Sequence, residues 1–260
     1  MALLDVKNLC VDFHTDQGTV HAVRDISFSV GESEAVGIVG ESGSGKSVTM
    51  YSVMGLLAGN GSITGGSVSL NGQEIKESAF PDHKAYEEAM SRIRGNQMAM
   101  IFQDPMTFLN PVVKIGKQIT EVIKNHQKVT DAEARARAIE LMGQVGIPSP
   151  EKRLNQYPHE FSGGMRQRAA FARTVLTGSD LLLLDEPFSA LDYLTRISMR
   201  EWLLEQWERE KKTVLFITHD VEEAVFLSSR ILVVEESPIT HLRSIDVPAE
   251  YPRSRDELRK

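Results

Sequence analysis

The chain has 260 residues, of which 41% are hydrophobic and 25% charged, with a formal net charge of −7. This composition is typical of a soluble globular protein with one large or two small domains, and the acidic balance argues against sequence-independent binding to nucleic acid, which needs a basic face. Cys10 is the single cysteine, so an intrachain disulfide is excluded and a reducing compartment is favoured.

The N-terminal segment is predicted to form strands rather than a targeting peptide. Asp5 lies in its apolar part and no basic region precedes it, unlike a signal peptide. Residues 3–13 alternate apolar and polar side chains, which predicts a strand, and "TVHAVRDISFSV" (19–30) predicts two more short strands. No apolar run approaches the ~20 residues needed to cross a bilayer. We therefore expect any action at a membrane to depend on a partner.

A buried strand, a glycine-rich loop and a helix come next. The strand is predicted in "EAVGIVG" and the helix in "VTMYSVMGLLA" (48–58). The loop between them fits G-x-x-x-x-G-K-[ST], and this context favours a P-loop over a glycine-rich turn with a stray lysine. We expect Lys46 to reach the β and γ phosphates of ATP and take part in the reaction, and Ser47 to bind Mg²⁺. The predicted nucleotide contacts are Gly40, Glu41, Ser42, Gly43, Ser44, Gly45, Lys46, Ser47 and Val48.

A hairpin and a further strand follow the P-loop helix. Asn71-Gly72 interrupts an alternating run, which is a strong hairpin signal. "QMAMIFQ" is an apolar strand that ends at Gln103. The Gln103 amide could contact Mg²⁺ or water, although an ordinary polar strand end is the stronger interpretation of this residue alone.

Residues 104 to about 178 are predicted to form a helical insertion. Thr130 and Glu133 make a capping box before "AEARARAIELM", where apolar residues recur at helical spacing. Further on, "HEFSGGMRQRAAFAR" places Ser162-Gly163-Gly164 at the start of a helix. The free N–H groups of such a start favour an anion. The chain thus has a second phosphate-facing helix start, far from the P-loop in sequence.

Two buried strands carry polar side chains at their ends. "DLLLLDEP" ends at Asp185, which suits a Mg²⁺ ligand, and at Glu186, which suits a general base that polarises the attacking water. Four preceding leucines argue against a solvated turn. "TVLFITHD" ends at His219, which could contact the γ-phosphate. A lone histidine is usually structural, but this one is expected at the same sheet edge as Asp185.

The order of these elements predicts an α/β fold. Strands alternate with helices, including one from 194 to 209, which indicates a P-loop NTPase core with a mainly parallel sheet. An antiparallel β subdomain is expected at the N-terminus. We assign residues 1–104 and 179–236 to the ATP-binding core, 105–178 to the helical subdomain and 237–260 to a surface tail.

Together these motifs resemble the ATP-binding subunit of ABC transporters over essentially the whole chain. The resemblance is carried by the P-loop, Gln103, "FSGGM", "LLLLDEP", "SALD" and "THD", in this order. It implies that Gln103 forms the Q-loop and His219 is the switch histidine. The implied signature is Phe161, Ser162, Gly163, Gly164 and Met165, and the implied D-loop is Ser189, Ala190, Leu191 and Asp192. Phe161 and Met165 depart from the usual LSGGQ.

The resemblance also implies how the chain works and where. In this family two subunits pair head to tail, so the signature residues Ser162, Gly163 and Gly164 of one close over the ATP of the other. The adenine stacks on an aromatic residue of the first strands, for which Phe13 is the candidate. Hydrolysis opens the dimer, and the movement passes through Gln103 and the helical insertion. The implied partners are a second ATPase subunit, identical or different, integral membrane subunits and, indirectly, a substrate-binding protein, with the chain on the cytoplasmic face of the cell membrane.

Two subfamilies compete for the cargo. The front half, with "GIVGESGSGKSVT" and "QYPHEFSGGMRQR", looks like importers of dipeptides, oligopeptides and nickel, whereas "LLLLDEPFSALDYLTR" looks like importers of nitrate, sulfonate and taurine. Because the helical insertion should touch the membrane subunits and is peptide-like, we favour peptides or nickel. No cysteine follows Cys10, so we expect no C-terminal iron–sulfur cluster.

Other ABC-type classes fit less well. DNA-repair and chromosome-maintenance ATPases place long coiled coils between the two halves, and no sustained heptads occur here. Translation-factor ATPases usually carry two cassettes in one chain. A non-catalytic ATP-binding module would typically lack the carboxylate of Glu186.

Overall fold

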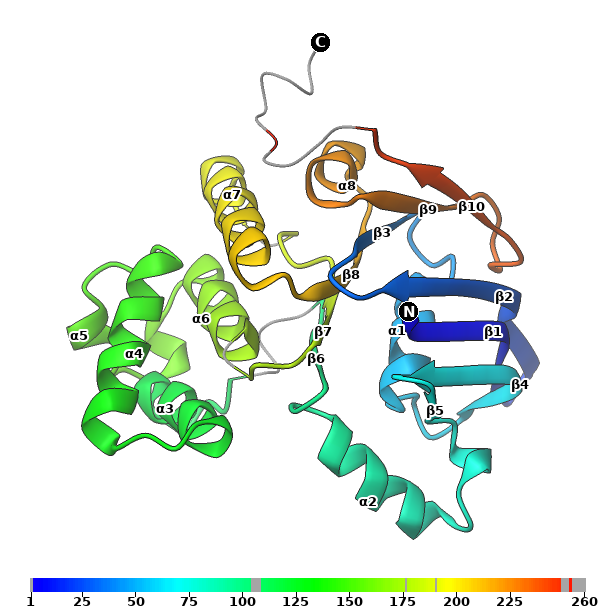
Figure 1. Cartoon of the computed structure of the whole chain (residues 1–260), viewed down its shortest axis with the longest axis horizontal. Coiled ribbons are helices and arrows are strands. Elements are labelled where there is room, and N and C mark those ends of the chain that lie inside the picture. Colours follow the sequence, from blue (N-terminus) through cyan, green and yellow to red (C-terminus); the bar gives the residue numbers. More distant parts are fainter. Residues whose placement is uncertain (1, 104–108, 176, 190, 249–252, 254–260) are drawn as a thin grey trace.

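The chain folds into two sheets flanked by helices (Figure 1). The computed structural model describes residues 2–103, 109–175, 177–189, 191–248 and 253. Its strands are β1 (Ala2–Thr15), β2 (Gly18–Gly31), β3 (Ala35–Val39), β4 (Gly61–Leu70), β5 (Gln73–Glu74), β6 (Met98–Ile101), β7 (Leu181–Asp185), β8 (Thr213–Thr218), β9 (Arg230–Val234) and β10 (Leu242–Asp246). Its helices are α1 (Lys46–Met54), α2 (His83–Ile93), α3 (Ile115–His126), α4 (Asp131–Gln144), α5 (Pro150–Arg153), α6 (Gly163–Val175), α7 (Tyr193–Glu210) and α8 (Val221–Leu227), with 3₁₀ turns η1 (Glu77–Ala79) and η3 (Pro158–Glu160).

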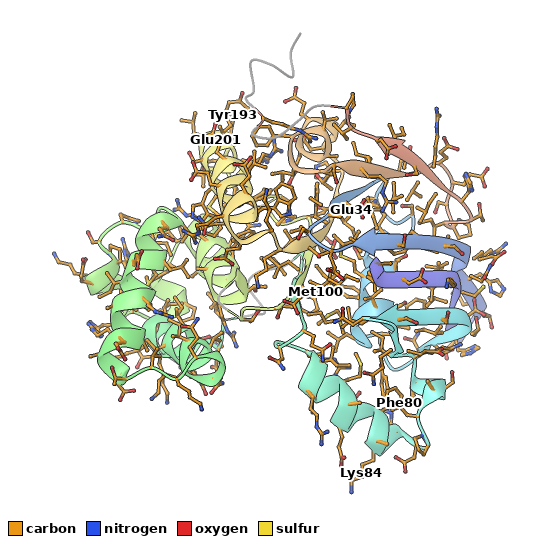
Figure 2. The ribbon with its side chains drawn as sticks, in the orientation of Figure 1. Glu34, Phe80, Lys84, Met100, Tyr193 and Glu201 are labelled. Carbon is orange, nitrogen blue, oxygen red and sulfur yellow. The ribbon has the colours of Figure 1, made fainter. Side chains whose placement is uncertain are left out.

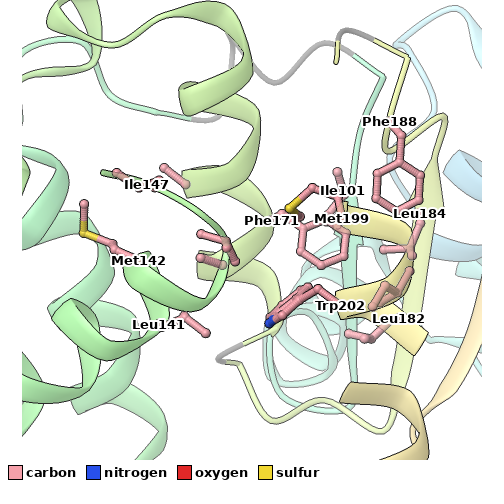
Figure 3. Packing of buried hydrophobic residues seen from close by; sticks show 14 of the residues in the cluster. Ile101, Leu141, Met142, Ile147, Phe171, Leu182, Leu184, Phe188, Met199 and Trp202 are labelled. Atoms are coloured by element: carbon pink, nitrogen blue, oxygen red, sulfur yellow. The ribbon is translucent and has the colours of Figure 1, made fainter. Parts of the chain in front are cut away.

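The larger sheet has the strand order β10-β9-β3-β8-β7-β6. Its inner pairs are parallel, and only β10 runs antiparallel to its neighbour, which confirms the predicted mainly parallel sheet. Leu181 and Leu183 of β7 belong to one apolar cluster, while Leu182 and Leu184 belong to another. Figure 3 shows Leu182 and Leu184 in the cluster that includes Trp202 of α7. Because both faces are covered, the strand is apolar at every position.

The smaller sheet is the antiparallel β subdomain, in the order β2-β1-β4-β5. The segment predicted as two short strands is the single strand β2, which is irregular rather than interrupted. Asn8 and Asp25 take left-handed φ values of 50° and 54°, and the Asn8 side-chain amide donates to Asp25 at 2.8 Å. These bulges break the polar alternation, which is why the sequence suggested two pieces. Asn71-Gly72 forms the predicted hairpin turn, with φ of 52° and 76°.

Helix α1 ends four residues earlier than the sequence predicted, at Met54. Gly55 adopts a left-handed φ of 62°, a common helix stop. Arg94, which follows α2, donates to the carbonyls of Met54 and Gly55 at 2.9 and 2.7 Å. Helix α2 itself was not anticipated; its Tyr86 is buried and meets the Phe80 ring edge-on at 5.6 Å. Figure 2 shows Phe80 in the segment that leads into α2.

Helices α3 to α6 form the group that the sequence predicted as an insertion (Figure 1). The Thr130 capping box is confirmed, because its hydroxyl accepts from the Glu133 amide and the Glu133 carboxylate accepts from the Thr130 amide. Residues 104–108, which would join this group to Gln103, lie outside the described residues.

The C-terminal segment differs from the surface tail assigned to 237–260. Strand β10 lies within it and pairs antiparallel with β9, extending the larger sheet. Most of its side chains are exposed, so hydropathy gave no signal of the main-chain pairing that holds it. Arg253 is buried and donates to the carbonyls of Val225 and Ser228 at 2.7 and 2.6 Å. Among the described residues, no helix has the length and apolarity that crossing a membrane would require.

Candidate functional site

The predicted P-loop connects β3 to α1 and is shaped for close packing. At Gly40, a Cβ would lie 2.7 Å from Val234 Cβ. At Gly45, φ is 107° and a Cβ would lie 2.6 Å from the Ala22 carbonyl oxygen. Both glycines are therefore required by the chain itself. No side chain caps the start of α1, so its first N–H groups remain available to an anion.

Lys46 is buried with its ammonium group turned onto its own loop. Nζ donates to the carbonyls of Gly40 at 2.8 Å and Glu41 at 2.5 Å, and to the Ser44 hydroxyl at 3.4 Å. Burial lowers its pKa, against the opposing charges of Glu186, Asp185 and Glu41. The loop thus encloses one fixed positive charge. Glu41 and Ser42 are exposed on the same loop.

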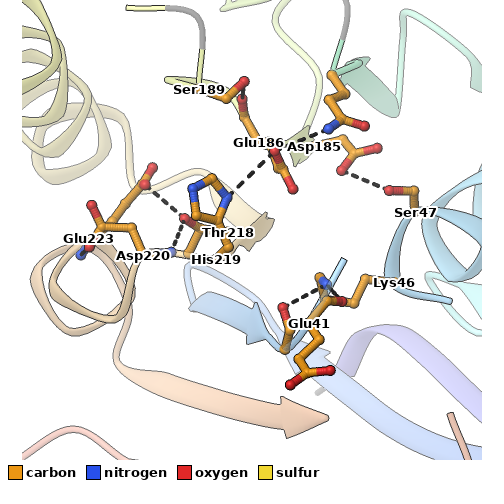
Figure 4. Close-up of polar contacts among 12 residues, drawn as sticks. Glu41, Lys46, Ser47, Asp185, Glu186, Ser189, Thr218, His219, Asp220 and Glu223 are labelled. Atoms are coloured by element: carbon orange, nitrogen blue, oxygen red, sulfur yellow. Dashed lines mark hydrogen bonds and ion pairs between the residues drawn. The ribbon is translucent and has the colours of Figure 1, made fainter. Parts of the chain in front are cut away.

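Ser47 and Asp185 meet where α1 begins and β7 ends (Figure 4). The Ser47 hydroxyl donates to Asp185 Oδ1 at 3.0 Å. The other oxygen, Oδ2, is buried and makes no hydrogen bond of ordinary geometry in the described chain, although the Tyr51 hydroxyl lies close enough to the carboxylate to act on its pKa. Burial raises the pKa of Asp185, with the hydrogen bond from Ser47 opposing. A hydroxyl beside a carboxylate with an unused oxygen fits the donors that Mg²⁺ prefers.

Glu186 is the centre of a second group at the same sheet edge. Its Oε2 accepts from Gln103 Nε2 at 3.1 Å and lies 3.6 Å from His219 Nδ1. The Glu186 side chain is 14% exposed and that of His219 62%. Figure 4 shows Glu186 between Asp185 and His219. The structure therefore brings Gln103 and His219 to Glu186, although they are 83 and 33 positions away in the sequence. The position of His219 at this sheet edge was expected from the sequence.

A buried polar network holds the loop that carries His219. The Thr218 hydroxyl donates to Glu223 at 2.8 Å and accepts from the Asp220 amide at 3.0 Å (Figure 4). Arg200 of α7 donates to Asp220 at 2.5 Å and to Glu223 at 3.1 Å. Burial raises the pKa of Glu223, whereas the Arg200 bond helps hold that of Asp220 below its usual value despite burial. The residues on either side of His219 are thus held in place, while its exposed ring lies beside Glu186.

A pocket of about 440 Å³ connects the P-loop to this histidine. Gly40, Glu41 and Ser44 line one side, His219 another, and the segment after β9 closes it with Glu235 and Glu236. The first part of the P-loop and His219 therefore share one cavity.

The signature candidates lie on the opposite side of the apolar core from α1. Met165 and Phe171 of α6 pack in one buried cluster, and Met50 and Val53 of α1 pack in the other. The Ser162 hydroxyl accepts from the Met165 amide at 3.3 Å, which caps the helix. The helix that follows the P-loop and the helix that follows Ser162 thus pack in different apolar clusters.

Phe13 and the D-loop residues stay predictions. The ring of Phe13 covers Gly61 of β4, where a Cβ would lie 2.6 Å from Phe13 Cε1. In the D-loop candidate, Ser189 binds the Glu186 carbonyl through its amide and its hydroxyl, at 3.2 and 3.0 Å, and Asp192 caps α7. Ala190 of that motif lies outside the described residues.

The sequence analysis assigned no role to three side chains near the site, namely Tyr51, Gln167 and Arg200. Tyr51 lies one helical turn after Ser47, and burial together with the charge of Asp185 raises its pKa to about 12. Gln167 of α6 is buried and donates to the Pro187 carbonyl at 2.5 Å. Arg200 is the third. Only the helical spacing of Tyr51 from Ser47 could have pointed to it in advance.

Comparisons with known proteins cover most of the chain. Residues 23–189 match a family described as ABC transporter. The chain is 41% identical over 252 residues to the oligopeptide transport ATP-binding protein OppD of Bacillus subtilis, which spans 96% of this chain and 68% of the relative. It is 42% identical over 245 residues to the dipeptide transport ATP-binding protein DppD of Lactococcus lactis, with 94% and 68% covered. A dimeric, post-hydrolysis structure of the ATP-binding cassette MJ0796 with ADP and Pi has the same fold, with a TM-score of 0.81 at 24% identity over 95% of this chain and 100% of that one.

Proposed function

This chain belongs to the ABC transporter family, and we propose that it is the ATPase subunit of a peptide importer. Its activity is the hydrolysis of ATP, with Mg²⁺ as cofactor. The observation that carries the proposal is the contact of Glu186 with Gln103 and His219, beside the Ser47–Asp185 pair at the P-loop.

Each residue of this group has a distinct part in the proposed reaction. The P-loop amides and Lys46 bind the phosphates, and Lys46 exchanges its loop carbonyls for phosphate oxygens. Ser47, Asp185 and Gln103 would hold Mg²⁺, which offsets negative charge on the β and γ phosphates when bound. Glu186 accepts a proton from the attacking water, and the His219 ring contacts and orients the γ-phosphate. His219 has the exposed ring that such a contact requires.

The signature glycines support a site shared by two chains. A Cβ at Gly163 would meet nothing within 4 Å, and at Gly164 only Leu191 Cδ2 at 3.5 Å. Neither glycine has a positive φ. Unlike Gly40 and Gly45, they are not required by their own chain. A close approach from outside accounts for them, and we propose that this is the ATP held by the P-loop of a second, head-to-tail subunit.

Replacement of the proposed base tests the catalytic assignment. The Glu186→Gln variant keeps the acceptor for Gln103 but cannot take a proton, so turnover should fall by on the order of a hundredfold or more. ATP binding should persist, measured with a fluorescent ATP analogue on the same preparation. Lys46→Ala is the matched comparison, because it should lose both ATP affinity and turnover. Turnover of Glu186→Gln at the parent rate would show that Glu186 is not the base.

The cargo and partners follow from the named relatives. Both are peptide-transport ATP-binding proteins and match this chain through its front and back halves. We propose integral membrane subunits and a peptide-binding protein as partners, with the chain at the cytoplasmic face of the membrane. The test is ATPase activity of the assembled complex in liposomes. It should rise with a peptide-loaded binding protein, whereas stimulation by nickel alone would favour the nickel class.

A further inference from the structure

The main chain of Glu186 is held in an unfavourable conformation. Its φ is 46°, a left-handed value that a non-glycine residue adopts only when its surroundings impose it. The Glu186 amide donates to the Ile217 carbonyl of β8 at 3.0 Å, and its carbonyl accepts from Ser189. These bonds fix the residue and close the turn to Ser189, and helix α6 contacts that turn from outside.

The chain leaving Glu186 is fixed by helix α6. Gln167, which is 2% exposed, donates through Nε2 to the Pro187 carbonyl at 2.5 Å. One turn later on the same helix, the Phe171 ring stacks on Phe188 at a centroid distance of 6.0 Å (Figure 3). The helix thus holds two consecutive residues after Glu186, one by a polar and one by an apolar contact.

The amide of Gln167 has no other visible use. Its Oε1 is buried and, within the described chain, meets no hydrogen-bond donor. A buried glutamine with one unsatisfied oxygen is costly, and leucine or methionine would fill the same space without that cost. The bond to Pro187 is therefore the property that distinguishes glutamine from an apolar residue at this position.

We propose that Gln167 is a positioning residue, which fixes the strained main chain of Glu186 to the helix that begins at the signature. The inference rests on the proposed role of Glu186 as the base. Gln167 touches neither the phosphates nor the water; it acts by setting where the Glu186 carboxylate lies. Since α6 opens with Gly163 and Gly164, the Gln167 bond links the residue after the base to the signature helix of the same chain.

The test compares Gln167→Met, which keeps the side-chain length and loses the donor, with the parent. Because a small displacement of a catalytic group is costly to the rate, kcat for ATP should fall on the order of tenfold to a hundredfold. The KM for ATP should stay within about twofold, since the P-loop is untouched. Thr213→Val is the matched control: it removes a buried hydroxyl that donates to the Gly31 carbonyl at 3.3 Å, at the other end of β8 from His219, and kcat should not change.

A double-mutant cycle separates positioning from general support of the fold. In the Glu186→Gln background, Gln167→Met should lower the residual rate no further, because its effect passes through Glu186. An unchanged kcat in folded Gln167→Met, or an equal loss in both backgrounds, would overturn the proposal. If Gln167→Met does not fold, Gln167→Asn keeps an amide that cannot span the same distance and is measured in the same way. Failure of the proposed function is distinct, because it would appear as unchanged turnover of Glu186→Gln alone.

Discussion

Asp185 is placed for chemistry at the expense of stability. It is fully buried, with one oxygen bound to Ser47 and the other without a partner in the described chain. Burial raises its pKa, so at neutral pH the ionised carboxylate is less stable in the folded chain than in the unfolded one. A residue retained under such conditions marks a functional position, and the unused oxygen is where a cation would compensate it.

This cost predicts that Asp185→Asn stabilises the chain in the absence of nucleotide and Mg²⁺. Asparagine still accepts from Ser47 but carries no buried charge, so the free energy of unfolding at pH 7 should rise by on the order of 1 kcal/mol, or about 2–4 °C. A carboxyl group with a raised folded-state pKa carries its full penalty above that pKa, and the penalty declines to zero as the pH falls to the unfolded-state pKa. The difference between variant and parent should therefore shrink as the pH falls through the raised pKa of Asp185. Thermal unfolding of both chains across pH measures it.

Mg²⁺-dependent turnover provides the control for that experiment. Asp185→Asn should lose it, because the carboxylate proposed to hold the metal is gone. A variant that is less stable than the parent at pH 7, or whose advantage grows on acidification, would contradict the assigned cost of burying Asp185.

At this scale the sequence predicted the residues that belong to fixed spacings. Lys46, Ser47, Asp185, Glu186 and His219 were found because a phosphate loop and strand-end carboxylates recur at set positions. Gln167 and Arg200 were not found, since their partners are 20 or more residues away and are set by helix packing. No local pattern encodes such a bond.

At the scale of elements, a buried ionic network ties α7 to α8. Arg200 pairs with Asp220 and Glu223 at the start of α8, immediately after the His219 loop. Glu223 is 5% exposed and its Oε1 is without a partner in the described chain. The network fixes the relative position of two helices that begin at the D-loop candidate and at the switch histidine.

Arg200→Met should therefore be strongly destabilising. Loss of the guanidinium leaves the Glu223 carboxylate buried without a counter-charge, which costs about 3–5 kcal/mol. Arg209→Met on the same helix is the matched control, because Arg209 is exposed and its change should stay within about 0.5 kcal/mol. Denaturant unfolding monitored by circular dichroism gives both values. Equal small effects would mean that the network contributes nothing beyond a surface pair.

The elements themselves were predictable where one physical signal dominated. Continuous apolar runs identified β7 and β8, since both faces of those strands are buried. A capping box identified the start of α4. Strand β10 was missed because its side chains are mostly exposed and its pairing is made by the main chain. The early end of α1 was missed although Gly55 is a common helix stop, and Arg94, 40 residues beyond Met54, binds that end.

At the scale of the whole molecule, the proposed function gives the chain two halves of a nucleotide site that do not serve each other. The P-loop residues converge with Asp185, Glu186 and His219, whereas Ser162 opens a helix packed in the other apolar cluster. If each place is half of a site, as we propose, then two subunits complete each other's sites on association. Helix α6 then has two functions. Its first turn presents the signature residues to a second subunit, and its Gln167 holds Pro187 of the same chain.

Substitution of a signature glycine should separate these two functions. Gly164→Asp introduces a Cβ that its own chain accommodates, and an acidic residue in the first turn of a helix is favourable by about 0.3–1 kcal/mol. The isolated variant should therefore fold and bind ATP like the parent. Its carboxylate would face the γ-phosphate of a partner, however, so ATP-dependent dimerisation of the Glu186→Gln chain and turnover of the otherwise native chain should both be lost. Analytical ultracentrifugation with and without ATP measures the first.

Gly143→Asp in α4 is the matched control for the added charge. Gly143 is exposed and a Cβ there would meet only Pro150 at 3.8 Å, in a helix that has no part in the proposed interface. This variant should dimerise with ATP as the Glu186→Gln chain does. If Gly164→Asp also dimerises, the signature does not bind the nucleotide of a second subunit. If instead it loses ATP affinity as a monomer, the glycines serve the P-loop of their own chain, and the reason for two separate helix starts must be sought within one molecule.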